Sequence, residues 1–273
     1  MVERDVSLVD QPDVSALTPE AQPVALAAAA IYARHTRPWL IGLLAHGSAL
    51  KGGYIPGCSD VDLQLYLRAE AFDDDSRLPL AVGLAIQRDL ARIPLGPFNY
   101  IQCYALPPHP RLGWVGPIPG AYHMILGRLP RPEATASDLR DAARRALDGT
   151  RPTPAYIADG MLTYSLARLE RHAGVLCTDV WPCVYHILTL AESDPIAMWR
   201  LAKPDAIARL PESADVRAKA GRFLQTVQSA FAGRRSAARY VAVIDEGVNL
   251  RSAVAGWYRA RIADGIDYTE TSA

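Results

Sequence analysis

The stretch LLAHGSALKGGYIPGCSDVDLQLYL, residues 43–67, carries the strongest structural pattern in this sequence. It opens with an apolar run and continues through a glycine-rich segment that begins at Gly47 and Ser48. Its last part, DVDLQLYL at residues 60–67, alternates polar and apolar side chains. This alternation is the period of a strand with one buried face. The stretch therefore predicts a strand, a glycine-rich turn and a second, half-buried strand.

Two aspartates on the second strand point to a cation. Asp60 and Asp62 are two positions apart, so on a strand their carboxylates share one face, roughly 6–7 Å apart. Mg²⁺ is bound by a few carboxylates together with phosphate oxygens. Gly47 allows the backbone to approach a phosphate closely, while the Ser48 hydroxyl and the following N–H groups can donate to its oxygens. Together these residues predict a site for a metal-bridged nucleoside triphosphate.

The same residues resemble a known signature. Gly-Ser, eleven residues and then Asp-x-Asp is similar to the signature of the polymerase-β-like nucleotidyltransferase superfamily. The longer sequence pattern, Gly-Ser-Ala followed by Gly-Gly and Ser-Asp-x-Asp-Leu, resembles that of the aminoglycoside nucleotidyltransferases. The resemblance implies that Gly47 and Ser48 bind the triphosphate, that Asp60 and Asp62 are catalytic metal ligands, and that Ser59 orients the aspartate loop. It also implies Mg²⁺ as cofactor and ATP, or another nucleoside triphosphate, as donor substrate.

Other residues near this signature are secondary candidates. Lys51 lies in the glycine loop and could contact the β- and γ-phosphates, although an exposed loop lysine without a role explains it equally well. His46 directly precedes Gly47 and could shape the pocket. In similar proteins a segment corresponding to residues 120–127, GAYHMILG, crosses the nucleotide. Tyr122 and His123 of this segment are therefore further candidate site residues.

One element of the family pattern is missing. Members carry a third carboxylate on a later strand, where it completes the metal site or acts as general base. The corresponding segment here, FNYIQCYAL at residues 98–106, contains no acid, and only Asn99 and Gln102 are polar residues of suitable shape. Three explanations remain open: a base from elsewhere, such as Glu192 or Asp194, a domain that binds Mg-nucleotide without transferring it, or a wrong strand assignment.

The pattern along the chain predicts two domains. An α/β (α+β) nucleotidyltransferase domain with a small mixed sheet is expected over residues 1–131, followed by an all-α helical-bundle domain over residues 132–273. No strand-like alternation follows residue 106. Outside the quoted stretch, helical spacing or strand-like runs predict helices at 24–35, 78–93, 135–149, 154–172, 182–192, 213–231 and 236–262, and strands at 38–45 and 98–106.

The composition limits the class of protein. The chain has 273 residues, half of them apolar, and no formal net charge, which is typical of a globular protein and argues against a polybasic nucleic-acid binder. Its four cysteines lack CxxC spacing and fit a reducing compartment. The amino terminus lacks the pattern of a signal peptide, and the apolar stretch at 23–33 is too short to span a membrane. We therefore expect a cytoplasmic protein with neither membrane nor nucleic-acid partners.

These observations favour one function over two others. The favoured function is Mg²⁺-dependent transfer of a nucleoside monophosphate, AMP from ATP, to a hydroxyl of a small molecule between the two domains; the resemblance favours an aminoglycoside-type antibiotic. The missing third acid motivates a degenerate, non-catalytic nucleotide-binding or regulatory module as the alternative. Modification of a protein or a tRNA is a third hypothesis, against which the long helical domain and the neutral charge argue.

Overall fold

The computed structural model describes residues 11–73, 77–109, 114–212 and 215–263. Contacts divide the chain into two compact units. The first holds Met1–Tyr54 and Ser59–Ala134, and the second holds Ile55–Cys58 and Thr135–Ala273. The expected domain limit after residue 131 remains a prediction, because the units are defined by contacts and the segment Ile55–Cys58 groups with the helical unit.

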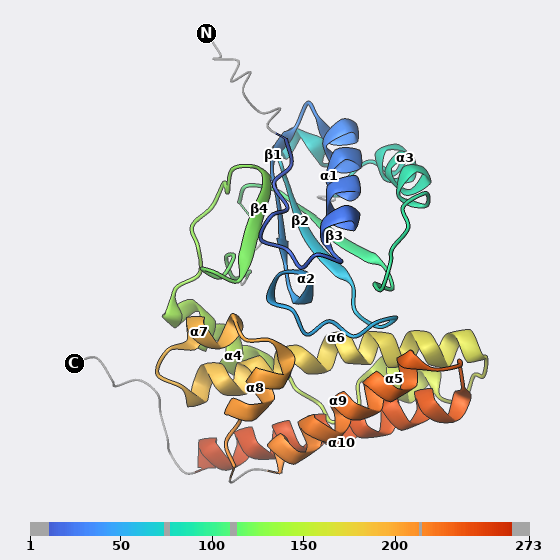
Figure 1. The fold of residues 1–273 in the computed structure, drawn as a ribbon. Coiled ribbons are helices and arrows are strands. Elements are labelled where there is room, and N and C mark those ends of the chain that lie inside the picture. The colour runs from blue at the N-terminus through green and yellow to red at the C-terminus, as the bar shows by residue number, and fades with distance from the viewer. Residues whose placement is uncertain (1–10, 74–76, 110–113, 213–214, 264–273) are drawn as a thin grey trace. The chain divides into compact units, whose positions relative to one another are not determined.

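The first unit is built on a four-stranded mixed sheet (Figure 1). The strand order is β3-β2-β1-β4, in which β1 is antiparallel to both neighbours and β2 is parallel to β3. The small mixed sheet expected from the sequence is confirmed. Its elements are α1 (Gln22–Thr36), β1 (Leu40–His46), α2 (Ser48–Lys51), β2 (Val61–Leu67), η1 (Ala69–Ala71), α3 (Leu80–Leu90), β3 (Ile101–Leu106) and β4 (Tyr122–Gly127).

Strand β2 separates two different faces of the sheet. Its residues Val61, Leu63, Leu65 and Leu67 are at most 1% exposed and belong to an aliphatic core that also contains side chains of α1 and α3. Figure 1 shows α1 and α3 on this side of the sheet. The polar positions of β2 project from the opposite face, beside a smaller cluster that includes Tyr66. The alternation predicted for this strand is therefore confirmed.

Strand β4 corrects the expectation that no strand follows residue 106. It pairs with β1 along the edge of the sheet. A register shift between Leu43 and Leu44 leaves Ile125 without a partner in the ladder. As a result, Ile125 and Leu126 both enter the aliphatic core although they are adjacent in sequence. The bulge breaks the period of two that sequence analysis uses to recognise a strand.

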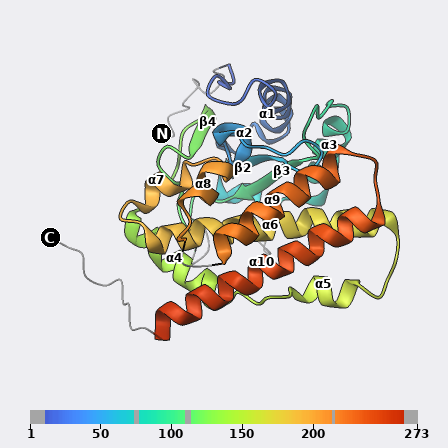
Figure 2. The ribbon, with the colours of Figure 1, turned by 60° about the horizontal axis from the view of Figure 1, so that its bottom comes forward.

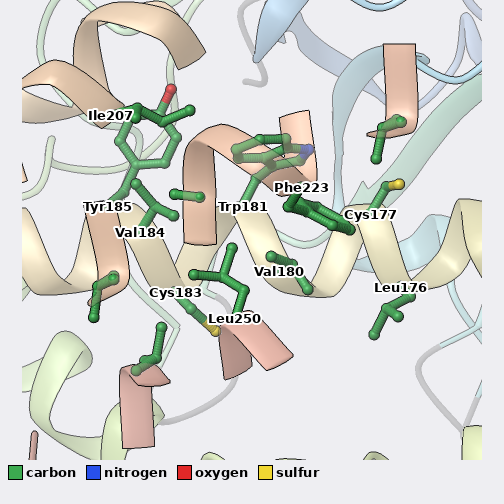
Figure 3. Close-up of a cluster of buried hydrophobic side chains, with 14 of the residues drawn as sticks. Leu176, Cys177, Val180, Trp181, Cys183, Val184, Tyr185, Ile207, Phe223 and Leu250 are labelled. Atoms are coloured by element: carbon green, nitrogen blue, oxygen red, sulfur yellow. The ribbon is translucent and has the colours of Figure 1, made fainter. Parts of the chain in front are cut away.

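The described part of the second unit is helical (Figure 2). Its longest helices, α6, α9 and α10, enclose one large core, and Figure 3 shows Trp181 and Phe223 meeting within it. Their ring centroids are 5.3 Å apart. The helices are α4 (Ala136–Asp148), α5 (Ala155–Gly160), α6 (Leu166–Ala191), α7 (Pro195–Trp199), α8 (Lys203–Arg209), α9 (Val216–Ala232) and α10 (Ala237–Ala263).

The bounds predicted for the helices at 154–172 and 182–192 are wrong, because α6 includes parts of both. The first of these is divided into α5 and the start of α6, where the Ser165 side chain caps α6 by accepting from the Arg168 N–H at 3.2 Å. The second is the end of α6, which continues through Pro182. Proline removes one backbone donor and usually ends or kinks a helix. Here the buried side chains on both sides of Pro182 hold the helix in the core, so packing overrides the local preference.

Helix α6 is also long and apolar enough to cross a membrane, judged by length and composition alone. In its most apolar window of 18 residues, however, 67% of the residues are buried inside the protein. Its apolar side chains therefore serve the helical core.

Candidate active site

The turn between β1 and α2 brings the Gly-Ser pair against an aspartate. Gly47 has a φ of +73°, in the left-handed region that favours glycine. A Cβ at this position would overlap Oδ2 of Asp62, so glycine is required both by the backbone and by the neighbouring carboxylate. Ser48 begins α2 and is 7% exposed, and the N–H groups of a first helical turn lack intrahelical acceptors. Gly47, Ser48 and Asp62, distant in sequence, thus lie together.

Asp60 lies directly before β2 and Asp62 within it. Oδ2 of Asp60 is buried and has no hydrogen-bond partner among the residues that the structure describes. A buried carboxylate oxygen without a donor is unfavourable, because it has lost its hydration without compensation. A cation or ordered solvent would compensate for this loss.

Four polar side chains form a row across the sheet at this end. The strand register places Gln102 of β3 opposite Asp62, Asp62 opposite His46 of β1, and His46 opposite Tyr122 of β4. Neighbouring strands lie about 4.8 Å apart, so each side chain is adjacent to the next. The row extends the aspartate site over all four strands.

His46 is held neutral within this row. Burial, and then the charge of nearby Lys51, lower its pKa from the usual 6.5 to about 4. The amide nitrogen of Gln64 lies 3.4 Å from Nε2 of His46, and since an amide nitrogen only donates, Nε2 is the acceptor. The carboxyamide oxygen of Gln64 accepts from the Tyr66 hydroxyl at 2.8 Å. A neutral imidazole leaves the negative charge of the aspartates available for a metal.

A second hydrogen-bonded chain follows β3, where a third carboxylate was expected. The Tyr100 hydroxyl donates to Oε1 of Gln102 at 3.2 Å, and Nε2 of Gln102 donates to the Tyr104 hydroxyl at 2.8 Å. Burial and then the charges of Asp62 and Asp60 raise the pKa of Tyr104, so its hydroxyl stays protonated at neutral pH. Gln102 is therefore beside Asp62, as the sequence predicted, but its amide is used to position two tyrosines.

Asn99 is separate from this row. It is exposed and precedes β3, and its backbone N–H donates to the carbonyl oxygen of Ser59 at 2.8 Å. Ser59 itself is 9% exposed. Asn99 thus supports the backbone just before Asp60 through its main chain, which any residue except proline could do.

The two candidate bases belong to the helical unit. Glu192 terminates α6, and Asp194 caps α7, where its Oδ1 accepts from the N–H of Ala197 at 3.0 Å. This cap is a structural role for Asp194. A catalytic role for either residue stays a prediction.

The tertiary structure adds a carboxylate that the sequence pattern did not single out. Glu133 accepts a hydrogen bond from the Tyr122 hydroxyl at 2.8 Å, at the β4 end of the row. Burial and Glu133 raise the pKa of Tyr122 to about 12. His123 alternates to the other side of β4, where Nε2 lies 3.0 Å from the carbonyl oxygen of Asp13 and 3.3 Å from its carboxylate. No sequence signal linked Glu133 to this site, because no motif spans the ten residues that lie between it and Tyr122.

The donor set limits the metal that could bind. Within the described residues, no group of three or more His, Cys, Asp or Glu side chains is placed to hold an ion. A structural Zn²⁺ site, which needs four such ligands, does not fit. Asp60 and Asp62 do fit a Mg²⁺ ion that completes its coordination with water and substrate phosphates.

Comparison with known proteins gives similarity to solved structures but not to a family model or a curated protein. No family model and no curated protein matches the chain. Among solved structures, it is similar to spectinomycin adenyltransferase AAD(9) from Enterococcus faecialis with ATP and spectinomycin, with 14% sequence identity and a TM-score of 0.48, over 85% of this chain and 98% of that chain. A likeness of this degree does not establish the activity or the ligands of this protein, so its function rests on its own residues.

Proposed function

We propose that the protein is a Mg²⁺-dependent nucleotidyltransferase that moves AMP from ATP to a hydroxyl of a small molecule, such as an aminoglycoside-type antibiotic. The observation that supports this best is the Gly47 turn packed against Asp62, beside a buried oxygen of Asp60 that has no hydrogen-bond partner in the described parts of the chain. A phosphate-binding turn and a neighbouring pair of carboxylates are together the two halves of a Mg-nucleotide site.

Each residue of the motif has a role in this proposal. Gly47 allows the triphosphate to approach the backbone, and Ser48 donates from its N–H and hydroxyl to a phosphate oxygen. Asp60 and Asp62 hold Mg²⁺, while Ser59 supports the aspartate loop. The bound ion would neutralise negative charge at the α-phosphate as pyrophosphate leaves. Lys51, at the end of α2, would add positive charge near the β- and γ-phosphates.

The uncharged side chains near the aspartates would orient the substrate rather than take up or release protons. The protonated hydroxyl of Tyr104, held by Gln102, lies near both aspartates and can donate to a substrate oxygen. Neutral His46 does not compete with a metal for the charge of Asp62. Removing a general base typically costs a factor of about 10²–10⁴ in rate. Transfer without a carboxylate on β3 would therefore be slow but measurable, unless Glu192, Asp194 or Glu133 supplies the base.

Thermal unfolding with and without Mg-ATP tests the binding step. A ligand concentration one hundred times the Kd adds about 2.7 kcal/mol to the free energy of unfolding. For a chain of this size we expect a rise in Tm of about 2–4 °C or more. We expect the rise only with Mg²⁺ present, and we expect Asp60→Asn/Asp62→Asn to abolish it. Asp141→Asn is the matched control, because this exposed carboxylate is paired with Arg144 of the same helix. An equal rise in the double variant would rule out the proposed metal–nucleotide site.

Release of pyrophosphate in the presence of candidate hydroxyl acceptors tests the transfer step. Mg²⁺-dependent release that requires both ATP and an acceptor supports the transferase. The double aspartate variant should lose about 10²–10³-fold in rate, since stabilising phosphoryl charge accounts for several kcal/mol.

A nucleotide-binding module without transfer is a second candidate. The observation in its favour is that Gln102, at the position of the expected third acid, is occupied between the hydroxyls of Tyr100 and Tyr104. This alternative predicts the Mg-ATP-dependent rise in Tm without pyrophosphate release for any acceptor class, small molecule, protein or tRNA.

A further inference from the structure

A pocket lies at the opposite end of the sheet from the aspartates. It has a volume of about 520 Å³, within the range of small-molecule sites. The start of β1 and the segments that follow β2, β3 and β4 line it. Strand β1 runs from this end, at Leu40, to the aspartate end, at His46. The two sites are therefore separated by about 20 Å of strand, so the pocket is distinct from the proposed nucleotide site.

Two arginines line this pocket from either side of β1. The backbone N–H of Arg68 bonds to the carbonyl of Trp39, and that of Arg128 bonds to the carbonyl of Ile41, which places the two residues on opposite flanks of the same strand. Both are exposed, and neither guanidinium has an acidic or hydrogen-bonding partner in the described ranges of the chain. Two uncompensated cations thus face one cavity.

A third arginine is close to the pocket in sequence and is partly buried, but it is not one of the lining residues. Arg131 directly follows Pro130, a lining residue. Its Nη2 donates to the carbonyl of Trp114 at a long 3.4 Å, while its Nε and Nη1 are buried and have no partner within the described segments. The Arg131 guanidinium also interacts with the Tyr66 hydroxyl through its charge and a side-chain hydrogen bond, and both oppose the rise in the pKa of Tyr66 that burial causes. Arg131 is therefore engaged by Trp114 and Tyr66 and is not counted among the groups that face the pocket.

The rest of the lining is apolar. Leu40, Ile41 and Leu129 contribute aliphatic surface, and Pro108 and Pro130 contribute rigid rings. Ile41 and Leu129 also pack against the small cluster on the polar face of the sheet. A free inorganic ion would leave this surface without a contact, whereas a ligand with an apolar body would bury it.

We propose that this pocket binds a small organic anion, a phosphate or carboxylate group on an apolar body, whose charge is held by Arg68 and Arg128. Guanidinium groups bind both oxyanions through paired charge-assisted hydrogen bonds. This site does not depend on the proposed nucleotidyltransferase activity.

Isothermal titration calorimetry at constant ionic strength, without Mg²⁺, tests the proposal with three probes: phenyl phosphate, benzoate and inorganic phosphate. We expect saturable binding of at least one organic anion, and tighter binding of phenyl phosphate than of inorganic phosphate. Arg68→Gln/Arg128→Gln should weaken the binding of the organic anion by about tenfold or more, because two charged donors are lost. Both side chains are exposed, so this variant should keep its fold. Whether phenyl phosphate or benzoate binds more tightly identifies the anionic group.

Two controls make the result specific. Arg88→Gln/Arg145→Gln removes two exposed arginines elsewhere and should leave the Kd unchanged. Asp60→Asn/Asp62→Asn should also leave it unchanged, which separates this site from the nucleotide site. The proposal is overturned if no organic anion binds at about 10 mM, if Arg68→Gln/Arg128→Gln binds as tightly as the wild type, or if the Arg88/Arg145 control weakens binding equally.

Discussion

The two faces of the sheet are made by the same strands but perform different tasks. On one face, Leu63 and its neighbours are fully buried against α1 and α3. On the other, Asp62, Gln64 and Gln102 belong to a polar surface in which glutamine amides link tyrosine and histidine side chains. The comparison indicates that the aliphatic face supplies stability, which leaves the polar face free to carry groups that are unfavourable for folding. The predictions below test this division.

The largest effect is expected on the aliphatic face. Leu63→Ala should lower the free energy of unfolding by about 2–5 kcal/mol, because it removes a buried side chain and leaves a cavity. Gln102→Ala, on the polar face of the adjacent strand, should cost about 1 kcal/mol, the net value of a hydrogen bond. Urea denaturation of both variants measures the difference. Equal losses would show that the polar face also stabilises the fold.

The next effect is a loss of stability in acid caused by His46. Its pKa is about 4 in the folded protein and about 6.5 when unfolded, so the unfolded state binds the proton first as pH falls. The free energy of unfolding should therefore be unaffected above about pH 6.5 and fall between pH 6.5 and 4, by roughly 3 kcal/mol in total.

Urea denaturation at pH 7 and pH 4.5 checks this, with His46→Gln as the variant that should lose less stability over that range. His186, whose pKa burial also lowers to about 4, provides the matched comparison in the helical unit. If His46→Gln shows the same pH dependence as the wild type, the imidazole is not held neutral by its surroundings.

A smaller effect is the expected difference in stability between alanine variants of two glycines. This difference separates backbone strain from contact with the aspartate. Gly47 and Gly52 both have positive φ, but only at Gly47 would a Cβ meet Asp62, since nothing lies within 4 Å of it at Gly52. Alanine at either position should cost about 1–2 kcal/mol from the left-handed backbone. Gly47→Ala should cost about 1–3 kcal/mol more and abolish the Mg-ATP-dependent rise in Tm, which Gly52→Ala should retain. Loss of the rise in both variants would assign the effect to the loop in general.

The smallest effect comes from restoring an acid to the polar row. Gln102→Glu places a carboxylate opposite Asp62, which should lower stability by about 0.5–1 kcal/mol without metal because like charges face each other. Added Mg²⁺ should reverse this loss. Gln225→Glu, at an exposed position of α9, controls for the added charge. Thermal unfolding with and without Mg²⁺ measures both, and the absence of any metal-dependent gain at position 102 would argue against a cation between these strands.

Local patterns predicted the elements whose signal lies within a few residues. The alternation from Asp60 to Leu67 gave the correct faces of β2, and the helix predicted from residue 135 begins with a capping box between Thr135 and Asp138 at the start of α4. The helices α9 and α10 also begin and end within three residues of the bounds predicted for them. In each case, the residues that determine the structure are neighbours along the chain.

Local patterns failed where distant parts of the chain decided the outcome. A bulge against β1 hid the strand at Tyr122–Gly127, and burial carried α6 through Pro182. A rule that considers only the adjacent residues cannot weigh either contribution, because both depend on which segments pack together.

The sequence alone therefore indicated which residues could carry chemistry: a Gly-Ser turn, two aspartates two positions apart, and the lack of an acid on the next strand. Only the tertiary structure decided what surrounds them. It placed His46 and Gln102 on either side of Asp62, used Gln102 to position Tyr104, and added Glu133 at the edge of the row. The physical reason is that strand register and burial set the protonation and hydrogen bonding of a side chain, and both arise from segments far apart in the chain.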